Sequence, residues 1–131
     1  MPLRAAVFDF DGVIVDSEPL HFRSLRDALR PEGVEITEEE YLQVYLAYDD
    51  REAIRLALEN HGESTDPARR GRIEARKVEI FARLIPEIPV FDGVRDLVRA
   101  LGAEMPLAIA SGARHDEVDA ILRGVGLRDA F

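Results

Sequence analysis

Two short apolar runs, one near each end of the chain, predict two β-strands. Residues 5–8 read Ala-Ala-Val-Phe and lead into Asp-Phe-Asp-Gly at 9–12. Residues 106–110 read Pro-Leu-Ala-Ile-Ala and lead into Ser-Gly at 111–112. Continuous apolar runs of this length, closed by turn residues, are typical of strands buried in a parallel sheet. We therefore expect a loop to open at the carboxyl end of each strand.

Between these runs, apolar residues recur at the spacing of amphipathic helices. The predicted helices cover residues 20–29, 37–46, 50–61, 67–84 and 93–101, and a sixth covers 115–123 after the second strand. Thr37 with Glu40 three residues later forms a capping-box pattern. Asp50 is expected to cap the third helix, and the pair Asp66-Pro67 is expected to start the fourth.

This order of elements indicates an α/β fold that carries an insertion. A parallel connection usually takes about a dozen residues or a little more, whereas residues 9–105 separate these two strands. We expect residues 17–87 to form an inserted helical subdomain, the cap. Residues 1–16 and 88–131 are then expected to form the core that carries the sheet.

The composition argues against two classes of binding partner. The chain has 17 basic and 26 acidic residues and a formal net charge of −9. This balance argues against binding to nucleic acid or to an anionic membrane, because both need clustered positive charge. The sequence contains no cysteine, no apolar run of membrane-spanning length and no signal-peptide pattern. We therefore expect a cytoplasmic protein without disulfides.

The acidic loop after the first strand is the leading candidate for chemistry. In an extended chain Asp9 and Asp11 point to the same side, while Phe10 points back to the core. Open α/β sheets bind ligands at the carboxyl ends of their strands. Two neighbouring carboxylates repel each other unless a cation or a shared proton compensates, and Mg²⁺ prefers such oxygen ligands. Taken alone, the pair is better explained by two solvated aspartates in a loop.

A longer stretch around these aspartates is informative. Residues 7–21, Val-Phe-Asp-Phe-Asp-Gly-Val-Ile-Val-Asp-Ser-Glu-Pro-Leu-His, resemble the first signature of the haloacid dehalogenase-like (HAD) phosphatase superfamily. They are most similar to the branch that includes β-phosphoglucomutase and phosphoglycolate phosphatase. Residues 110–114 resemble the second signature, and the helical insert resembles the cap of this branch. The resemblance implies a Rossmann-like α/β core with an inserted helical cap.

The resemblance also implies a reaction. It suggests a Mg²⁺-dependent phosphomonoester hydrolase that acts on a small phosphorylated metabolite. Asp9 would attack phosphorus and form an aspartyl phosphate. Asp11 would protonate the leaving alcohol and later deprotonate the attacking water. The carboxylate of Asp9 and the backbone carbonyl of Asp11 would be the metal ligands.

The second signature implies a phosphate-binding role. Ser111 and Gly112 would contact the transferring phosphate together with the N-terminus of the following helix. A plain helix cap is the alternative explanation for Ser111. Arg114 would either bind a substrate phosphate or pair with Asp116 or Glu117.

Two residues of the insert have candidate roles toward the substrate. His21 matches a histidine that many relatives carry after the first signature, and both a substrate-facing role and hinge packing remain open for it. Residues 49–52, Asp-Asp-Arg-Glu, resemble the cap loop that relatives point at the substrate. Acidic capping of a helix explains Asp50 and Glu52 but leaves Arg51 unexplained, so Arg51 is the candidate for substrate contact.

Two further signatures of the superfamily do not occur in the chain. A lysine or arginine and an acidic pair that completes the metal site are expected beyond the last predicted helix, and Lys77 lies in the insert instead. A sugar phosphomutase and a catalytically incomplete phosphate-binding fragment are therefore the alternatives to a phosphatase. We expect either a C-terminal fragment as a partner or self-association through the exposed edge of the sheet.

Overall fold

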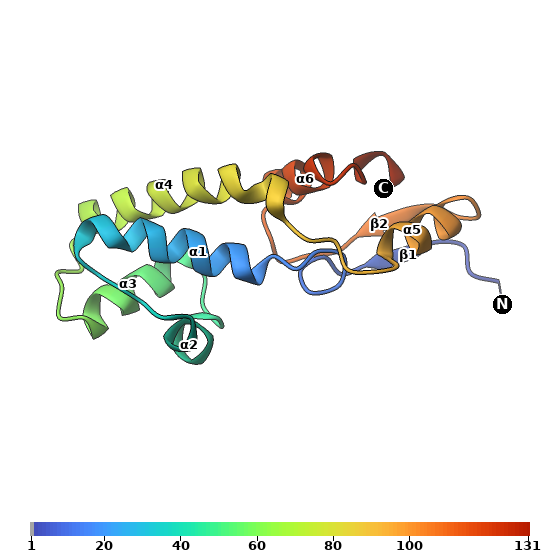
Figure 1. Ribbon diagram of the computed structural model, residues 1–131. Helices are drawn as coiled ribbons and strands as arrows, with labels where there is room; N and C mark the ends of the chain where they lie inside the picture. The colour runs from blue at the N-terminus through green and yellow to red at the C-terminus, as the bar shows by residue number, and fades with distance from the viewer. Residues whose placement is uncertain (1) are drawn as a thin grey trace. The chain divides into compact units, whose positions relative to one another are not determined.

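The computed structural model describes residues 2–131, which divide into two compact units. One unit comprises the residues up to Glu18 together with Leu84–Phe131, and we call it the sheet unit. The other comprises Pro19–Arg83, and we call it the helical unit. The α/β architecture expected from the sequence is present, with its strands and helices labelled in Figure 1.

The sheet unit contains two short parallel strands, β1 at Ala6–Phe8 and β2 at Leu107–Ile109. Phe8 lies beside Ile109 in the register of the pair. The backbone N–H of Ala110 donates to the carbonyl of Phe8 at 2.9 Å, which extends the pairing to the ends of the strands. Because the strands run in the same direction, the loops that follow them leave the sheet at the same end, the carboxyl end of both strands.

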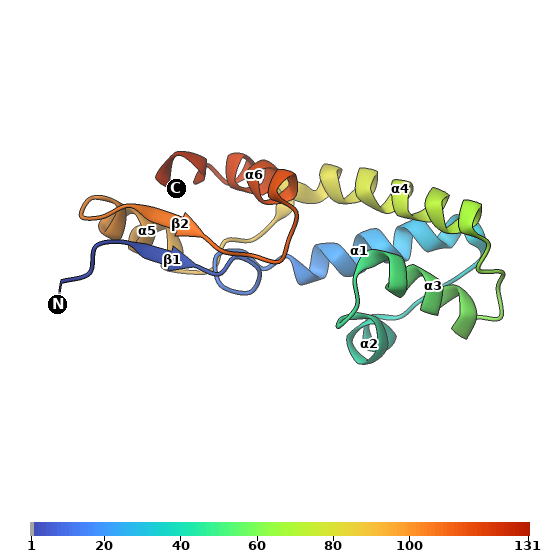
Figure 2. The ribbon, with the colours of Figure 1, turned by 180° about the vertical axis from the view of Figure 1, so that it is seen from behind.

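One face of this small sheet is covered by helix α5, at Val94–Gly102. The helix lies in front of the strands in Figure 1 and behind them in Figure 2, and its Val98 is buried. On the strands, Val7 is 65% exposed although it belongs to an apolar run. Its register partner Ala108 is exposed as well. The face that carries Val7 is therefore open to solvent.

The helical unit is built from α1 at Glu18–Leu29, α2 at Glu38–Glu40, α3 at Asp50–Asn60 and α4 at Pro67–Leu84. Twelve buried residues form its hydrophobic core: Leu25, Ala28, Leu29, Val34, Ile36, Tyr41, Tyr45, Ala53, Ile54, Ala57, Leu58 and Ile73. On α1 and α3 the cluster residues recur at helical spacing, so each of these helices presents one apolar face to the cluster. Ile73 comes from α4, and Val34 and Ile36 come from the segment before α2. The last helix of the chain, α6 at His115–Gly124, belongs to the sheet unit.

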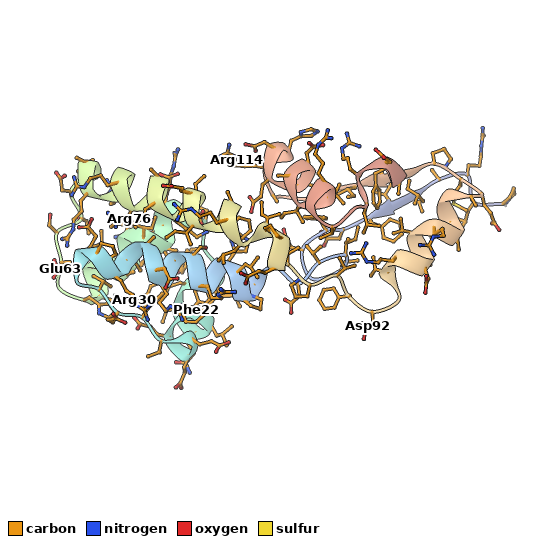
Figure 3. All side chains as sticks on the ribbon, turned by 45° about the horizontal axis from the view of Figure 1, so that its top comes forward. Phe22, Arg30, Glu63, Arg76, Asp92 and Arg114 are labelled. Carbon is orange, nitrogen blue, oxygen red and sulfur yellow. The ribbon has the colours of Figure 1, made fainter. Side chains whose placement is uncertain are left out.

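Polar side chains join α4 to the end of α1 within the helical unit. Arg69 Nε lies 2.9 Å from Glu32 Oε2, and the hydrogen bond from Arg69 lowers the pKa of Glu32. Arg69 also pairs with Glu63 at 2.9 Å. Arg76, labelled with Glu63 in Figure 3, donates to the carbonyl of Ala28 at 2.6 Å. These contacts satisfy carbonyl and carboxylate groups at the end of α1.

The local signals at two helix starts are confirmed. Asp66 Oδ2 accepts hydrogen bonds from the N–H groups of Ala68 and Arg69, as expected for the cap of α4. Thr37 Oγ1 accepts from the Glu40 N–H at 3.1 Å. The Glu40 carboxylate accepts in return from the Thr37 backbone, as in a capping box, and also from the Tyr45 hydroxyl, and these bonds lower its pKa.

The structure corrects two predictions about the helices. The cap of α3 is Asp49, whose Oδ1 accepts from the Glu52 N–H at 2.9 Å, and Asp50 lies in the first turn. The single helix expected over 37–46 is a short α-turn that continues as a π-helical turn at Tyr41–Tyr45. Within residues 2–131, no helix is long and apolar enough to cross a membrane.

Candidate functional site

The loop after β1 has the alternation that its sequence predicts. Phe10 is fully buried, while Asp9 and Asp11 on either side of it are exposed. Asp9 Oδ1 accepts a hydrogen bond from the backbone N–H of Phe10 at 2.7 Å. This bond holds the Asp9 carboxylate against its own backbone, at the carboxyl end of the strand.

A buried serine positions the second aspartate. Ser17 is 1% exposed, and its Oγ donates to Asp11 Oδ1 at 2.5 Å. The chain returns to this point through a tight turn in which the N–H of Gly12, at φ 78°, donates to the carbonyl of Val15 at 2.9 Å. From the sequence, Ser17 was expected only to begin the cap. Its contact with Asp11 depends on this turn, which brings residues six positions apart together.

The loop after β2 carries the expected phosphate-binding residues. Ser111 is half-buried, and its Oγ accepts from the N–H of Ala113 at 3.1 Å. Gly112 is exposed, with open space where a Cβ would lie. Because β1 and β2 are parallel neighbours, Ser111 and Gly112 follow the sheet at the same carboxyl end as Asp9 and Asp11.

Arg114 precedes α6 and forms an ion pair with a neighbour in sequence. Its Nε and a terminal nitrogen lie 3.0 and 2.6 Å from the two carboxylate oxygens of Asp116, and its place before α6 is marked in Figure 3. These hydrogen bonds hold the pKa of Asp116 below its usual range. The sequence left two roles open for Arg114, and in the structure Arg114 pairs with Asp116. A role in phosphate binding stays a prediction.

The donor atoms of the β1 loop suit Mg²⁺ but complete only part of a site. An exposed carboxylate on Asp9 and a backbone carbonyl on Asp11 are hard oxygen ligands of the kind this ion prefers. Within residues 2–131, no group of three or more histidine, aspartate or glutamate side chains could hold a metal ion. The remaining ligands would be water, substrate oxygens or residues outside this chain.

In the helical unit, His21 belongs to a polar cluster with a buried lysine. The His21 ring stacks on Phe81 with ring centroids 4.5 Å apart. Lys77 Nζ lies 3.3 Å from His21 Nδ1 and 2.7 Å from Asp50 Oδ1. The Lys77 side chain is only 4% exposed, so this ammonium group depends on Asp50 for its counter-charge.

Sequence reasoning missed the place of Lys77. It lies four residues after Ile73 and four before Phe81, both buried, so its position on the inner face of α4 follows from helical spacing. It is also the single lysine beside sixteen arginines. These two signals together could have indicated a special role.

Arg51, the residue expected to contact substrate, is 82% exposed and pairs with Glu74 of α4 at 3.2 Å. The predicted site residues thus belong to two units. Asp9, Asp11 and the Ser111 loop lie in the sheet unit with Arg114, whereas His21 and Arg51 lie in the helical unit.

Comparisons with known proteins find similar phosphatases. Phosphorylated carbohydrates phosphatase of Thermotoga maritima is 27% identical over 98% of this chain and 59% of its own length. Phosphoglycolate phosphatase of Synechococcus elongatus is 30% identical over 98% of this chain and 58% of its own length. The crystal structure of CbbY from Rhodobacter sphaeroides in complex with phosphate has a TM-score of 0.79 at 28% identity, covering 99% of this chain and 61% of that one.

The chain therefore spans less than two thirds of the length of these relatives. A family model described as haloacid dehalogenase-like hydrolase matches residues 3–131. Because that match covers nearly the whole chain and the fold agrees with it, the chain belongs to the haloacid dehalogenase-like hydrolases.

Proposed function

We propose that this chain contributes the nucleophile and the general acid of a Mg²⁺-dependent phosphomonoester hydrolase that acts on a small phosphorylated metabolite. The observation that carries the proposal is the parallel register of β1 and β2. This register brings Asp9 and Asp11 to the same end of the sheet as Ser111, the end where both strands finish. The phosphatase names of two relatives and the phosphate-bound state of a third support it.

The reaction has two displacements at phosphorus. A carboxylate oxygen of Asp9 forms a bond to phosphorus while the bond from phosphorus to the substrate alcohol oxygen breaks. The Asp11 carboxyl group gives its proton to that leaving oxygen. A water molecule then attacks the aspartyl phosphate, Asp11 takes up the proton of the water, and inorganic phosphate leaves Asp9 as a free carboxylate.

Neighbouring groups orient these steps. Ser17 binds Oδ1 of Asp11, which leaves Oδ2 as the oxygen that exchanges a proton with substrate and water. Ser111 and the N-terminus of α6 offer hydrogen-bond donors and a positive helix end to the transferring phosphate. The Asp9 carboxylate and the Asp11 backbone carbonyl would hold Mg²⁺, which when bound would supply positive charge to offset the repulsion between nucleophile and phosphate.

We further propose that a C-terminal segment of the family fold completes the site by pairing with the free edge of β1. The N–H of Ala6 and the carbonyl of Phe8 bond toward β2. Because successive residues of a strand point their backbone groups to opposite sides, those of Val7 point to the other edge. The sheet consists of β1 and β2 within residues 2–131, so nothing described pairs with that edge.

The test uses this chain joined to the C-terminal part of a relative, either as one polypeptide or as two. Asp9→Asn should abolish release of inorganic phosphate, because an amide is a poor nucleophile. Asp11→Asn should slow alkyl phosphates by about 10²–10⁴-fold, the usual contribution of a general acid, and slow aryl phosphates much less. Asp96→Asn is the matched control, since Asp96 lies on α5 and is 88% exposed.

Two results would contradict the proposal. Full phosphate release by Asp9→Asn would show that Asp9 is not the nucleophile. Equal losses of activity on aryl and alkyl substrates in Asp11→Asn would show that Asp11 is not the general acid. Isomerisation of a sugar phosphate without release of phosphate would identify a phosphomutase. Phosphate binding without turnover in the completed protein would identify a binding module.

A further inference from the structure

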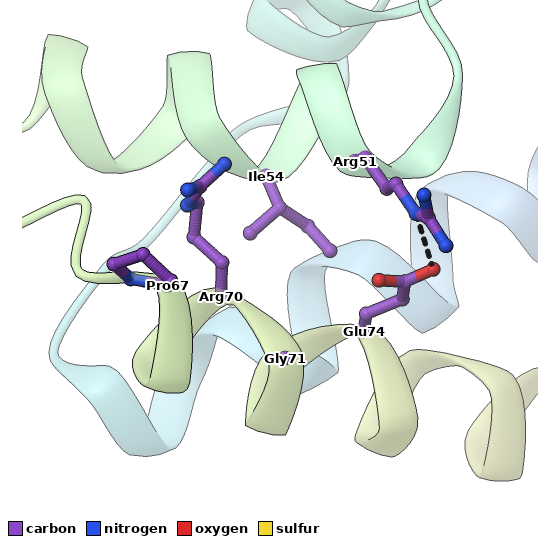
Figure 4. A pocket seen from close by; sticks show the side chains of 6 residues that line it. All are labelled: Arg51, Ile54, Pro67, Arg70, Gly71 and Glu74. Carbon is purple, nitrogen blue, oxygen red and sulfur yellow. Dashed lines mark hydrogen bonds and ion pairs between the residues drawn. The ribbon is translucent and has the colours of Figure 1, made fainter.

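A small pocket opens between α3 and α4 of the helical unit (Figure 4). Its volume is about 190 Å³, and its lining residues are Arg51, Ile54, Pro67, Arg70, Gly71 and Glu74. With about 30 Å³ for each water molecule, this space holds about six waters. It is smaller than the roughly 300–1,000 Å³ of a pocket for a drug-sized ligand. The volume therefore suits a small ion or one functional group of a metabolite.

Arg70 brings an unsatisfied donor to this pocket. Its Nε is buried and has no hydrogen-bond partner among the described residues. Figure 4 shows the side chain reaching from α4 toward α3, beside Ile54 and Pro67. A buried donor without an acceptor is costly, and the donors of a guanidinium group match the oxygens of a carboxylate or phosphate.

Gly71, the next residue of α4, gives a second and independent indication. Glycine inside a helix is less favourable than alanine, and Gly71 lies in the interior of the 18-residue helix α4. A Cβ built at Gly71 would meet nothing within 4 Å, so packing inside this chain does not require the glycine. A glycine in that setting is typical of a place where a ligand approaches the backbone closely.

The charges around the pocket favour an anion. Arg51 and Glu74 pair at 3.2 Å, as the dashed line in Figure 4 marks, and so compensate each other. Glu52 is hydrogen-bonded to Arg55 at 2.5 Å, and both this bond and the nearby charge of Arg70 lower the pKa of Glu52. Arg70 thus remains the guanidinium group whose inner nitrogen still needs an acceptor.

We propose that this pocket binds a small oxyanion, a phosphate or a carboxylate group, on the guanidinium group of Arg70 and over the backbone of Gly71. The anion accepts hydrogen bonds from Arg70, and its remaining atoms lie against Ile54 and Pro67. Arg51 at the rim can add a second guanidinium group when it leaves Glu74. The proposal does not depend on phosphatase activity, because every residue it uses lies in the helical unit.

The test is a titration of the whole chain with inorganic phosphate, followed by NMR at the Arg70 side-chain Nε and the Gly71 amide. Both signals should shift and saturate. Arg70→Gln should weaken the affinity at least about tenfold, as expected for a hydrogen bond to a charged group. Gly71→Ala should weaken it similarly while raising the melting temperature, because alanine favours the helix.

Matched controls separate recognition from general charge. Arg83→Gln removes a 70% exposed arginine that pairs with Glu79 on the same helix, so it should leave the affinity within about twofold. Arg70→Lys keeps the charge but lacks the planar fork, so it should also bind more weakly. Acetate in place of phosphate distinguishes a carboxylate site from a phosphate site.

Three outcomes would overturn the proposal. The first is a shift that does not saturate with either phosphate or acetate. The second is an affinity that is unchanged in Arg70→Gln or in Gly71→Ala. The third is an equal response to chloride at the same ionic strength, which would indicate a diffuse effect of positive charge.

Discussion

The helical unit encloses a cluster of twelve buried residues, whereas the sheet unit, over the residues that the structure describes, pairs two strands of three residues each. Ile54 in the helical cluster is fully buried, and Val7 in the middle of β1 is 65% exposed. Val7 comes from an apolar run, and Ile54 comes from the apolar face of an amphipathic helix. The helical unit therefore buries the apolar residues that its sequence supplies, while part of the apolar surface of the sheet unit stays exposed.

This difference follows from how the two kinds of structure satisfy their own backbone. A helix makes its hydrogen bonds within one segment, so a few helices can enclose a core together. A strand makes its backbone hydrogen bonds with neighbouring strands, and a parallel sheet is usually covered on both faces. The same two-stranded sheet carries the aspartates of the proposed reaction, and the proposed pairing of β1 with a further segment therefore concerns the part of the chain that carries the chemistry.

The largest expected effect tests the core of the helical unit. Ile54→Ala should lower the free energy of unfolding of that unit by about 2–5 kcal/mol, the usual cost of a cavity in a packed core. Val7→Ala should change stability by less than about 1 kcal/mol, because little of its surface is buried. All three tyrosines lie at positions 41–48, so tyrosine fluorescence during urea unfolding measures Ile54→Ala in the helical unit, while backbone circular dichroism, which covers both units, measures Val7→Ala. Equal losses of unfolding free energy in the two variants would contradict the difference in burial between Ile54 and Val7.

A second prediction concerns the buried ammonium group of Lys77. Asp50→Asn removes its counter-charge and should destabilise the helical unit by about 1–3 kcal/mol, because a buried charge without its partner is costly. Lys77→Met removes that charge but keeps an apolar stem, and it should cost less than about 1 kcal/mol. The double variant should resemble Lys77→Met in the same urea measurement. A double variant as unstable as Asp50→Asn would show that Asp50 acts independently of Lys77.

The smallest expected effect is a loss of folding stability at alkaline pH. Burial, together with the neighbouring Glu40 carboxylate, raises the pKa of Tyr45 to about 12 from an ordinary value of 10.0. The folded state thus holds this proton more tightly than the unfolded state. Its contribution to stability is complete below pH 10 and is lost as the pH rises toward 12. Unfolding followed by circular dichroism should show this loss, and Tyr45→Phe should reduce it. An unchanged pH dependence in Tyr45→Phe would assign the loss to other groups.

Features that depend on short sequence patterns were predictable. The pair Asp66-Pro67 and the apolar spacing after it placed α4 at residues 67–84, as observed. The alternation around Phe10 predicted that the phenyl ring is buried and that both neighbouring carboxylates are exposed. In each case a local rule of capping or of strand geometry determines the outcome.

Features that depend on contacts between segments were not predictable. Either Asp49 or Asp50 could cap α3, and the choice is tied to Asp50 binding Lys77 from another helix. The π-helical turn at Tyr41–Tyr45 follows the same apolar spacing as an α-helix, and there the Tyr45 hydroxyl reaches the Glu40 carboxylate. The contact from Ser17 to Asp11 depends on the turn through Gly12.

Hydrogen exchange at single amides tests most directly whether β1 needs a further strand. In this chain alone, at concentrations where it is monomeric, the Val7 amide should exchange rapidly and the Ile54 amide orders of magnitude more slowly. Joining the C-terminal part of a relative should slow exchange at Val7 and leave Ile54 nearly unchanged. A Val7 amide that is already as protected as Ile54 in the monomeric chain would contradict the account.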